Sequence, residues 1–135
     1  KRAIHRFHIV LIFVDFHGEA TSEKMAFAHY VDARVSAVIG THTHIPTADA
    51  HILAGGTAYM SDAGMTGDYD SVIGIQKQQS VERFIKKLPG AHFIPASENM
   101  TLCGALVIAS NNTGSASAIH PVRIGDTLAP VMPDV

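Results

Sequence analysis

The chain has 135 residues, 47% of them hydrophobic and 16% charged, which is enough for one folded domain or part of one. Its formal net charge of -2 and its lack of a basic run exclude the electrostatic character of a protein that binds nucleic-acid polymers. The longest apolar run, residues 9–14, is far below the roughly 20 residues that span a bilayer, and no cleavable leader is recognisable, so we expect a cytoplasmic protein without a membrane partner.

The first part of the chain predicts a βαβ unit. The run HIVLIFVDF, residues 8–16, is nearly all apolar and rich in β-branched residues, which is typical of a strand buried on both faces. Residues 19–34 predict a helix that Thr21 or Ser22 can cap. The segment VSAVIG, residues 35–40, predicts the next short buried strand. Two such strands joined by a helix indicate a parallel sheet covered by helices.

The two predicted helices differ in their patterns. In the first, the residues that recur at helical spacing are Met25, Ala28, His29 and Asp32. The second, QKQQSVERFIKKL at residues 76–88, is amphipathic and is followed by Pro89-Gly90, which should end it. Its apolar face consists of Val81, Phe84, Ile85 and Leu88.

The remaining segments predict strands and turns. Residues 55–62 form a third strand, and residues 63–74 form a loop punctuated by glycines. Residues 101–124 predict an antiparallel hairpin that turns at NNTG. Residues 126–135 contain prolines and predict a loose tail. The fold class is therefore α/β, with a parallel βαβ start and a carboxyl-terminal antiparallel hairpin.

Nine histidines stand out in a chain whose single cysteine, Cys103, excludes an internal disulfide and a thiolate-rich zinc site. Two of them, His42 and His44, follow a predicted strand in VIGTHTHIPTAD, residues 38–49. Residues two apart in extended backbone point the same way, so we expect both imidazoles to face one volume at the strand end. On this pair alone, a functional site and two hydrogen-bonding loop residues are equally good interpretations.

The end of the first strand adds a third histidine. The segment VDFHGE contains Asp15, His17 and Glu19, with Asp15 and His17 on one face. If the first two strands are parallel neighbours, His17, His42 and His44 emerge at the same edge of the sheet. Three imidazoles there suit a transition metal. A polar rim without metal is the alternative, which we rank second.

Three blocks carry a resemblance to a known family: VDFHGEATSEK, VSAVIGTHTHIPTAD and GGTAYMSDAGMTGDYDSVIG. In this order they resemble the carboxyl-terminal half of the YmdB-like branch of the calcineurin-like metallophosphoesterases. The resemblance implies that residues 1–125 are one half of a metallophosphoesterase β-sandwich flanked by helices. It also implies hydrolysis of a small phosphodiester, a 2′,3′-cyclic nucleotide, with two divalent transition-metal ions (Fe, Mn or Zn) as cofactors.

The same resemblance implies roles for the histidines. His17 and His42 correspond to ligands of one metal, and His44 to a ligand of the other. Two cations a few ångströms apart can activate water and stabilise the charge on phosphate oxygens, which is what this hydrolysis requires. Three carboxylates either orient these imidazoles by accepting their ring N–H groups or are ordinary solvated side chains: Asp15, Glu19 and Asp49.

The chain departs from the family pattern in one large respect. The family's site also draws on an amino-terminal half with an aspartate, a bridging glutamate, an asparagine and the general-acid histidine, and these blocks do not occur in the sequence. We therefore expect this chain alone to be inactive and to bind one ion weakly at His17 and His42. Half a sandwich exposes an apolar face, so we also expect association with the other half or with a second copy. The alternative function is a non-catalytic metal-binding or oligomerisation module.

Overall fold

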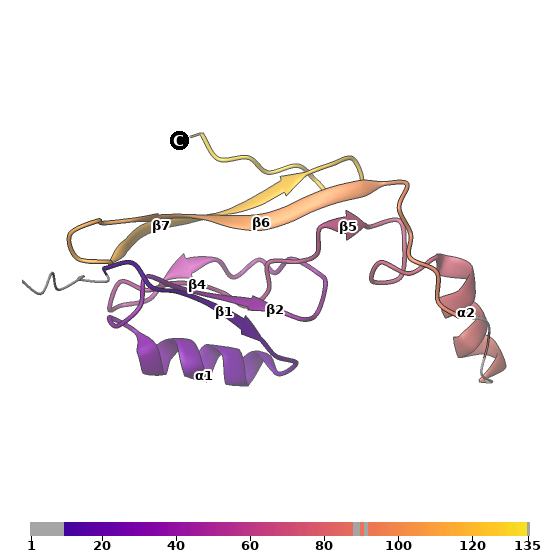
Figure 1. The fold of residues 1–135 in the computed structure, drawn as a ribbon, viewed down its shortest axis with the longest axis horizontal. Coiled ribbons are helices and arrows are strands. Elements are labelled where there is room, and N and C mark those ends of the chain that lie inside the picture. Colours follow the sequence, from indigo (N-terminus) through magenta and orange to yellow (C-terminus); the bar gives the residue numbers. More distant parts are fainter. Residues whose placement is uncertain (1–9, 88–89, 91, 135) are drawn as a thin grey trace, which may run out of the picture.

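The computed structural model describes residues 10–87, 90 and 92–134 of the chain. They form a four-stranded sheet of order β1-β2-β4-β3 and a three-stranded sheet of order β5-β6-β7. Figure 1 shows the β6–β7 hairpin above the four-stranded sheet and α1 below it, which confirms the predicted α/β class. The elements are β1 (Phe13–His17), α1 (Thr21–Val31), β2 (Ala37–Thr41), β3 (His51–Ile52), β4 (Ala58–Met60), β5 (Gly67–Asp68), α2 (Lys77–Lys86), β6 (Met100–Ala109) and β7 (Ala116–Ile124).

The predicted βαβ unit is confirmed. Strands β1 and β2 are parallel, with a register that runs from Phe13 opposite Ala37 to His17 opposite Thr41. Strand β4 lies parallel to β2 on its other side. The carboxyl ends of all three strands therefore meet at one edge of the sheet. The short β3, antiparallel to β4, was not expected, because a two-residue strand leaves no periodic pattern in the sequence.

The core has one layer on each face of the four-stranded sheet. Val38 of β2 and Tyr59 of β4 pack with Ala28 of α1. The preceding residues of these two strands, Ala37 and Ala58, face the opposite way and pack against β7. This follows from the alternation of side chains along a strand. Alanine is small, so the hairpin can pack closely on the sheet at these positions.

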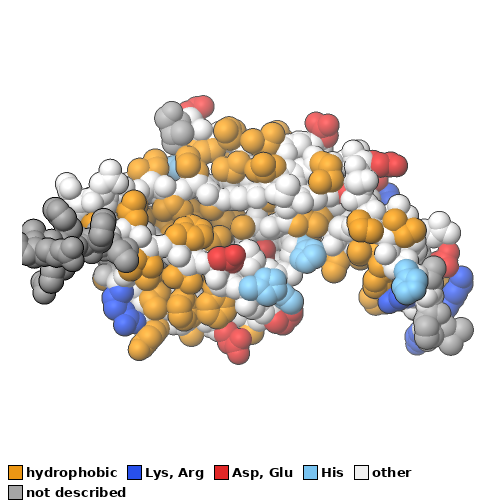
Figure 2. All heavy atoms as spheres, in the orientation of Figure 1, with side chains coloured by type: hydrophobic (Ala, Val, Ile, Leu, Met, Phe, Trp, Pro, Cys, Tyr) orange, Lys and Arg blue, Asp and Glu red, His pale blue; other side chains and the backbone are white. Residues whose placement is uncertain are grey.

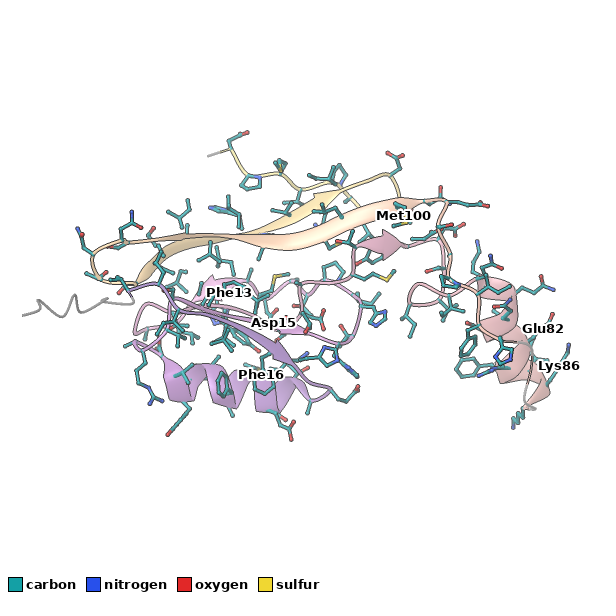
Figure 3. All side chains as sticks on the ribbon, in the orientation of Figure 1. Phe13, Asp15, Phe16, Glu82, Lys86 and Met100 are labelled. Atoms are coloured by element: carbon teal, nitrogen blue, oxygen red, sulfur yellow. The ribbon has the colours of Figure 1, made fainter. Side chains whose placement is uncertain are left out.

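The first strand differs from its prediction. Residues 8–16 were expected to form a strand buried on both faces, but β1 begins at Phe13, whose exposed fraction is 62%; residues 8 and 9 lie outside the described part. The cause is position, because β1 is an edge strand whose one neighbour among the described strands is β2. Figure 3 shows Phe16 on the α1 side of this strand and Phe13 on the other.

Helix α1 also differs in detail. It begins after Ala20, and no described side chain caps its first amides, so the prediction that Thr21 or Ser22 caps it is wrong. The Ala20 carbonyl accepts the first helical hydrogen bonds instead. The residues that α1 buries are Lys24 and Ala28, whereas Met25 of the predicted face is 41% exposed.

Helix α2 is present but does not cover the sheet. Figure 1 shows it at one end of the molecule, away from both sheets. It ends at Lys86, where Lys87 adopts a left-handed conformation (φ 51°), and so before the predicted stop at Pro89-Gly90. Leu88 and Pro89 lie outside the described residues. The other predicted apolar residues are exposed: Val81 (48%), Phe84 (83%) and Ile85 (74%). No described helix is long and apolar enough to cross a membrane.

The carboxyl-terminal hairpin is confirmed, with an irregularity between Ile108 and Ala109. Strand β5 lies within the predicted loop at residues 63–74 and pairs with β6. Two backbone hydrogen bonds join Val131 to Arg123 of β7, at 2.7 and 2.9 Å. The tail, predicted to be loose, is therefore attached to the hairpin at this point.

Candidate functional site

His17 and His42 lie side by side at the carboxyl edge of the four-stranded sheet. His17 is the last residue of β1 and pairs in register with Thr41, so His42 is the first residue beyond β2. His42 Nδ1 is 3.0 Å from His17 Nε2. The two rings are nearly perpendicular, at 84°, with centroids 4.9 Å apart. The parallel βαβ unit thus brings together two histidines that are 25 residues apart.

Hydrogen bonds at the outer ends of this pair set its tautomers. The Thr41 hydroxyl donates to Asp15 Oδ1 over 3.0 Å. It has no second proton, so at 3.1 Å it accepts the Nδ1–H of His17, and His17 Nε2 keeps a lone pair. His42 Nε2 lies 2.6 Å from Glu19 Oε2 and donates to it, which leaves a lone pair on His42 Nδ1. The network therefore directs two ring nitrogens at one another.

His17 Nε2 and His42 Nδ1 face each other at 3.0 Å. Two lone pairs at that distance repel each other unless a positive charge lies between them. A second proton on His42 supplies it in acid. A divalent cation supplies it when the rings are neutral, because neutral imidazole nitrogens are good ligands for transition metals. Carboxylates lie behind both rings, Asp15 through Thr41 and Glu19 directly, which is the arrangement usual behind metal-binding imidazoles.

The loop that follows β2 is not extended, which corrects the expectation that His42 and His44 share a face. His42 has φ 129° and His44 has φ 68°, a region that residues other than glycine rarely adopt. His42 contacts His17, whereas the Nδ1–H of His44 donates to the carbonyl of Ile73 over 2.9 Å. Strained backbone of this kind is concentrated at functional sites.

The three histidines are not assembled into one metal-binding group. Within the part of the chain that the structure describes, no three His, Cys, Asp or Glu side chains are placed to hold one ion together. His17 and His42 are adjacent, and His44 is bonded elsewhere. Figure 2 shows histidine and acidic side chains next to one another on this face of the molecule.

A half-buried tyrosine, Tyr69, holds the histidine loop in place. The Tyr69 hydroxyl donates to the His44 carbonyl over 3.0 Å and accepts from the backbone N–H of Met65 over 2.9 Å. Burial, together with the nearby Cys103, raises the pKa of the Tyr69 phenol, which keeps it a hydrogen-bond donor. Tyr69 was not predicted as part of the site, because it belongs to the predicted loop and comes near the histidines only through the fold.

Asp49 does not orient any of the three histidine rings, which was the role considered for it. Its carboxylate accepts hydrogen bonds from the backbone N–H and the hydroxyl of Ser61, next to β4, and not from a described histidine ring. Burial opposes its charge, but the hydrogen bonds from Ser61 and Thr47 outweigh burial and hold the pKa of Asp49 below its usual value. Asp49 is therefore a structural link between the histidine loop and the end of β4.

The family model described as YmdB-like protein matches residues 1–122. The chain belongs to the YmdB-like protein family. It is 47% identical over 115 residues to the 2′,3′-cyclic-nucleotide 2′-phosphodiesterase of Bacillus subtilis (strain 168), covering 85% of this chain and 43% of that protein. It is 49% identical over 112 residues to a putative phosphatase/phosphodiesterase of Mycoplasma pneumoniae, covering 82% of this chain and 40% of that protein. The chain thus spans less than half the length of these curated relatives.

Two solved structures support the same assignment. A hypothetical protein from Thermus thermophilus superimposes with a TM-score of 0.81 at 40% identity, over 90% of this chain and 47% of that one. A structure described as a novel phosphatase of Mycoplasma pneumoniae superimposes with a TM-score of 0.77 at 39% identity, over 83% of this chain and 40% of that one. Three of these four proteins carry functional names: a 2′,3′-cyclic-nucleotide 2′-phosphodiesterase, a putative phosphatase/phosphodiesterase and a phosphatase.

Proposed function

We propose that this chain supplies the histidine half of a binuclear metal centre that hydrolyses a phosphodiester of the 2′,3′-cyclic nucleotide class. The observation that carries the proposal is the pair of ring nitrogens of His17 and His42 that face each other at 3.0 Å, with a carboxylate behind each ring. His17 and His42 would hold one divalent ion, and His44 would contribute to a second. When bound, such ions supply Lewis acidity towards water and the phosphate oxygens.

The chain's own residues have defined tasks in this proposal. Glu19 and the Asp15–Thr41 pair orient the imidazoles, because each accepts the ring proton that is remote from the ion. The name of the Bacillus subtilis relative supports the choice of substrate class. The three histidines are too few to hold two ions firmly, since such metals normally take three or four protein ligands. The rest of the ligands must come from outside this chain, so we expect the chain alone not to hydrolyse the substrate.

We also propose that the part of the relatives which this chain does not match covers β1. This strand is at the edge of the sheet, and Leu11, Ile12 and Phe13 are 51%, 40% and 62% exposed. Parallel sheets are normally covered on both faces, and the chain spans only 43% of the Bacillus subtilis relative. A second copy of the chain is the alternative partner. Coexpression with the unmatched part of that relative should give a one-to-one complex in sedimentation, whereas a stable homodimer would favour self-association.

The test of the metal site is a titration of the chain with Mn²⁺ and Zn²⁺, with His17→Ala, His42→Ala and His44→Ala compared with wild type. Loss of His17 or His42 should weaken binding of the single ion at least about tenfold. Removing a group that only hydrogen-bonds to a metal ligand already lowers metal affinity by about this factor, and His17 and His42 would be ligands themselves. His44→Ala should leave this ion bound, because His44 is not part of the adjacent pair. Binding should also weaken in acid, since a protonated ring cannot be a ligand.

A matched control is His29→Ala, an exposed histidine in the last turn of α1, which should bind the ion as wild type does. In the coexpressed complex, hydrolysis of 2′,3′-cyclic AMP should appear and should fall with each of the three active-site variants but not with His29→Ala. If His17→Ala and His42→Ala kept the metal affinity of wild type, the proposal would be wrong and the histidines would be loop residues.

A further inference from the structure

A lysine is buried under the histidine loop. Lys24 of α1 is 1% exposed, and its Nζ lies 3.6 Å from Oδ2 of Asp62, in a pair whose side chains are both 1% exposed. Lysine is almost never fully buried unless it is paired, because removing its charge from water is costly. In the described part of the chain Nζ has no hydrogen-bond partner, so its interaction with Asp62 is electrostatic.

The path of the lysine is built into the sheet. Gly40, near the end of β2, leaves room for the aliphatic part of Lys24, since a Cβ there would lie 2.8 Å from Lys24 Cδ. The same Cβ would lie 1.8 Å from the carbonyl oxygen of Ser61. The glycine therefore permits both the close approach of β2 to the chain after β4 and the passage of the lysine to the carboxyl edge.

Asp62 connects the lysine to the histidine loop. Its Oδ2 accepts the backbone N–H of Thr43 over 2.8 Å, and its Oδ1 accepts that of Gly64 over 2.9 Å. Thr43 is the residue between His42 and His44, both of which have positive φ. An unfavourable backbone conformation persists only where its surroundings hold it. The hydrogen bond from Thr43 to Asp62 can hold the backbone conformation of both histidines, because Thr43 lies between them.

We propose that the buried Lys24–Asp62 pair positions the His42–His44 loop. Lys24 holds the carboxylate in one orientation, the carboxylate accepts the amide N–H of Thr43, and the loop then directs His42 at His17. The pair acts through the loop and touches neither substrate nor metal, so both members are positioning residues. The proposal rests on the proposed function only in that the loop would carry metal ligands.

The test measures the loop and the rest of the fold separately in the 135-residue chain. Amide hydrogen exchange by NMR is followed at Thr43 and, as the reference for the sheet, at Val38, in Lys24→Met, Asp62→Asn and the double variant. Lys24→Met keeps the length of the side chain without its charge. In Asp62→Asn, an NH₂ group replaces one of the two carboxylate oxygens that accept the backbone N–H groups of Thr43 and Gly64. One of these two N–H groups then has no acceptor. Titration with Mn²⁺ is carried out on the same samples.

In all three variants Thr43 should exchange about tenfold faster or more relative to Val38, the effect expected for losing a hydrogen bond to a charged group. The ring signals of His42 should shift, while those of His29 stay in place. The affinity for Mn²⁺ should fall in the variants in which the Thr43 amide is less protected from hydrogen exchange. A control is Lys86→Met, which removes the cation of an exposed pair with Glu82 on α2 and should change none of these quantities.

The outcomes separate positioning from simple stabilisation. If Thr43 and Val38 lose protection together, the pair only stabilises the fold and the proposal is wrong. If a single variant does not fold, the double variant decides, because it has no unpaired buried charge; wild-type protection of Thr43 in it would also overturn the proposal. If the wild-type chain binds no metal, the proposed function fails, but the exchange at Thr43 still tests the positioning role.

Discussion

The two helices of this chain show opposite relations between sequence pattern and burial. Helix α2 has the clearer apolar face, yet Phe84 and Ile85 on that face are 83% and 74% exposed. Helix α1 has a weaker pattern, yet it covers the sheet through Ala28 and buries the charged Lys24 completely. An apolar face on a helix predicts that the face is covered by another element. It does not predict whether that element belongs to the same chain or to a partner.

The connections explain this difference. α1 is the crossover between two adjacent parallel strands, and a right-handed crossover has to pack on the sheet. α2 lies in the connection between β5 and β6, which are antiparallel neighbours, so no such constraint acts on it. Two contacts link it to the chain that follows: Gln79 Oε1 accepts the backbone N–H of Ile94 over 2.8 Å, and the Arg83 guanidinium lies 3.9 Å from the centre of the Phe93 ring. The body around α1 should therefore determine the stability of the chain, and the α2 arm should contribute little.

The largest expected effect is in the body. Tyr59→Ala removes a side chain that is 1% exposed, packs with α1 and shares a 2.9 Å hydrogen bond with the Ser61 hydroxyl. We expect it to lower the free energy of unfolding by about 3–5 kcal/mol, as for other large aromatic residues in a core. Urea unfolding followed by circular dichroism measures this. Tyr30→Ala, a tyrosine of α1 that is 74% exposed, is the control and should cost less than about 1 kcal/mol. Equal losses would mean that α1 packs differently.

A smaller effect is expected where α1 is joined to the turn before β4. The Asp32 carboxylate accepts the backbone N–H groups of Ala33, Gly55 and Thr57 over 2.9, 2.7 and 3.2 Å. Burial opposes its charge, but these bonds outweigh burial and lower the pKa of Asp32 below its usual value. Asp32→Asn should lower the free energy of unfolding at neutral pH by about 1–2 kcal/mol, the low end for bonds to a partly solvated charge.

The stabilisation by the Asp32 carboxylate should depend on pH. Because the pKa of Asp32 is lower in the folded state, its carboxylate stabilises the fold above the unfolded pKa, and this stabilisation is lost as the pH falls below about 4. The difference between wild type and Asp32→Asn should therefore shrink in acid, as measured by unfolding at a series of pH values. Asp70→Asn, at an exposed pair with Lys77, should change stability by less than about 1 kcal/mol. A difference independent of pH would contradict the assignment.

The smallest effect is expected in the α2 arm. Phe84→Ser should change the free energy of unfolding of this chain by no more than about 0.5 kcal/mol, because the side chain is 83% exposed. In the complex with the remaining part of the relative, the same change should weaken assembly if that part covers α2, which sedimentation at several concentrations would measure. A cost above about 1.5 kcal/mol in the isolated chain would show that the apolar face of α2 is packed after all.

The candidate site shows which of its parts the sequence can predict. The adjacency of His17 and His42 followed from two apolar runs and a helical segment, because parallel neighbours end at the same edge. Its assignment as a metal site stays a prediction. The direction of His44 did not follow, because the alternation rule requires extended backbone and the loop has positive φ at both histidines. Thr41 was within the quoted motif, and its place opposite His17 could have indicated its role.

By itself, the sequence determined the α/β class, the βαβ unit, the hairpin and the family, because these depend on the order and periodicity of apolar residues and on contiguous motifs. Only the tertiary structure decided that β1 is an exposed edge, that α2 leaves its apolar face uncovered, and that Lys24 reaches Asp62 under the histidine loop. The reason is that burial is a property of neighbours. Lys24 and Asp62 are 38 positions apart (62 − 24), and no local pattern records that a glycine in the strand between them leaves room for the lysine to pass.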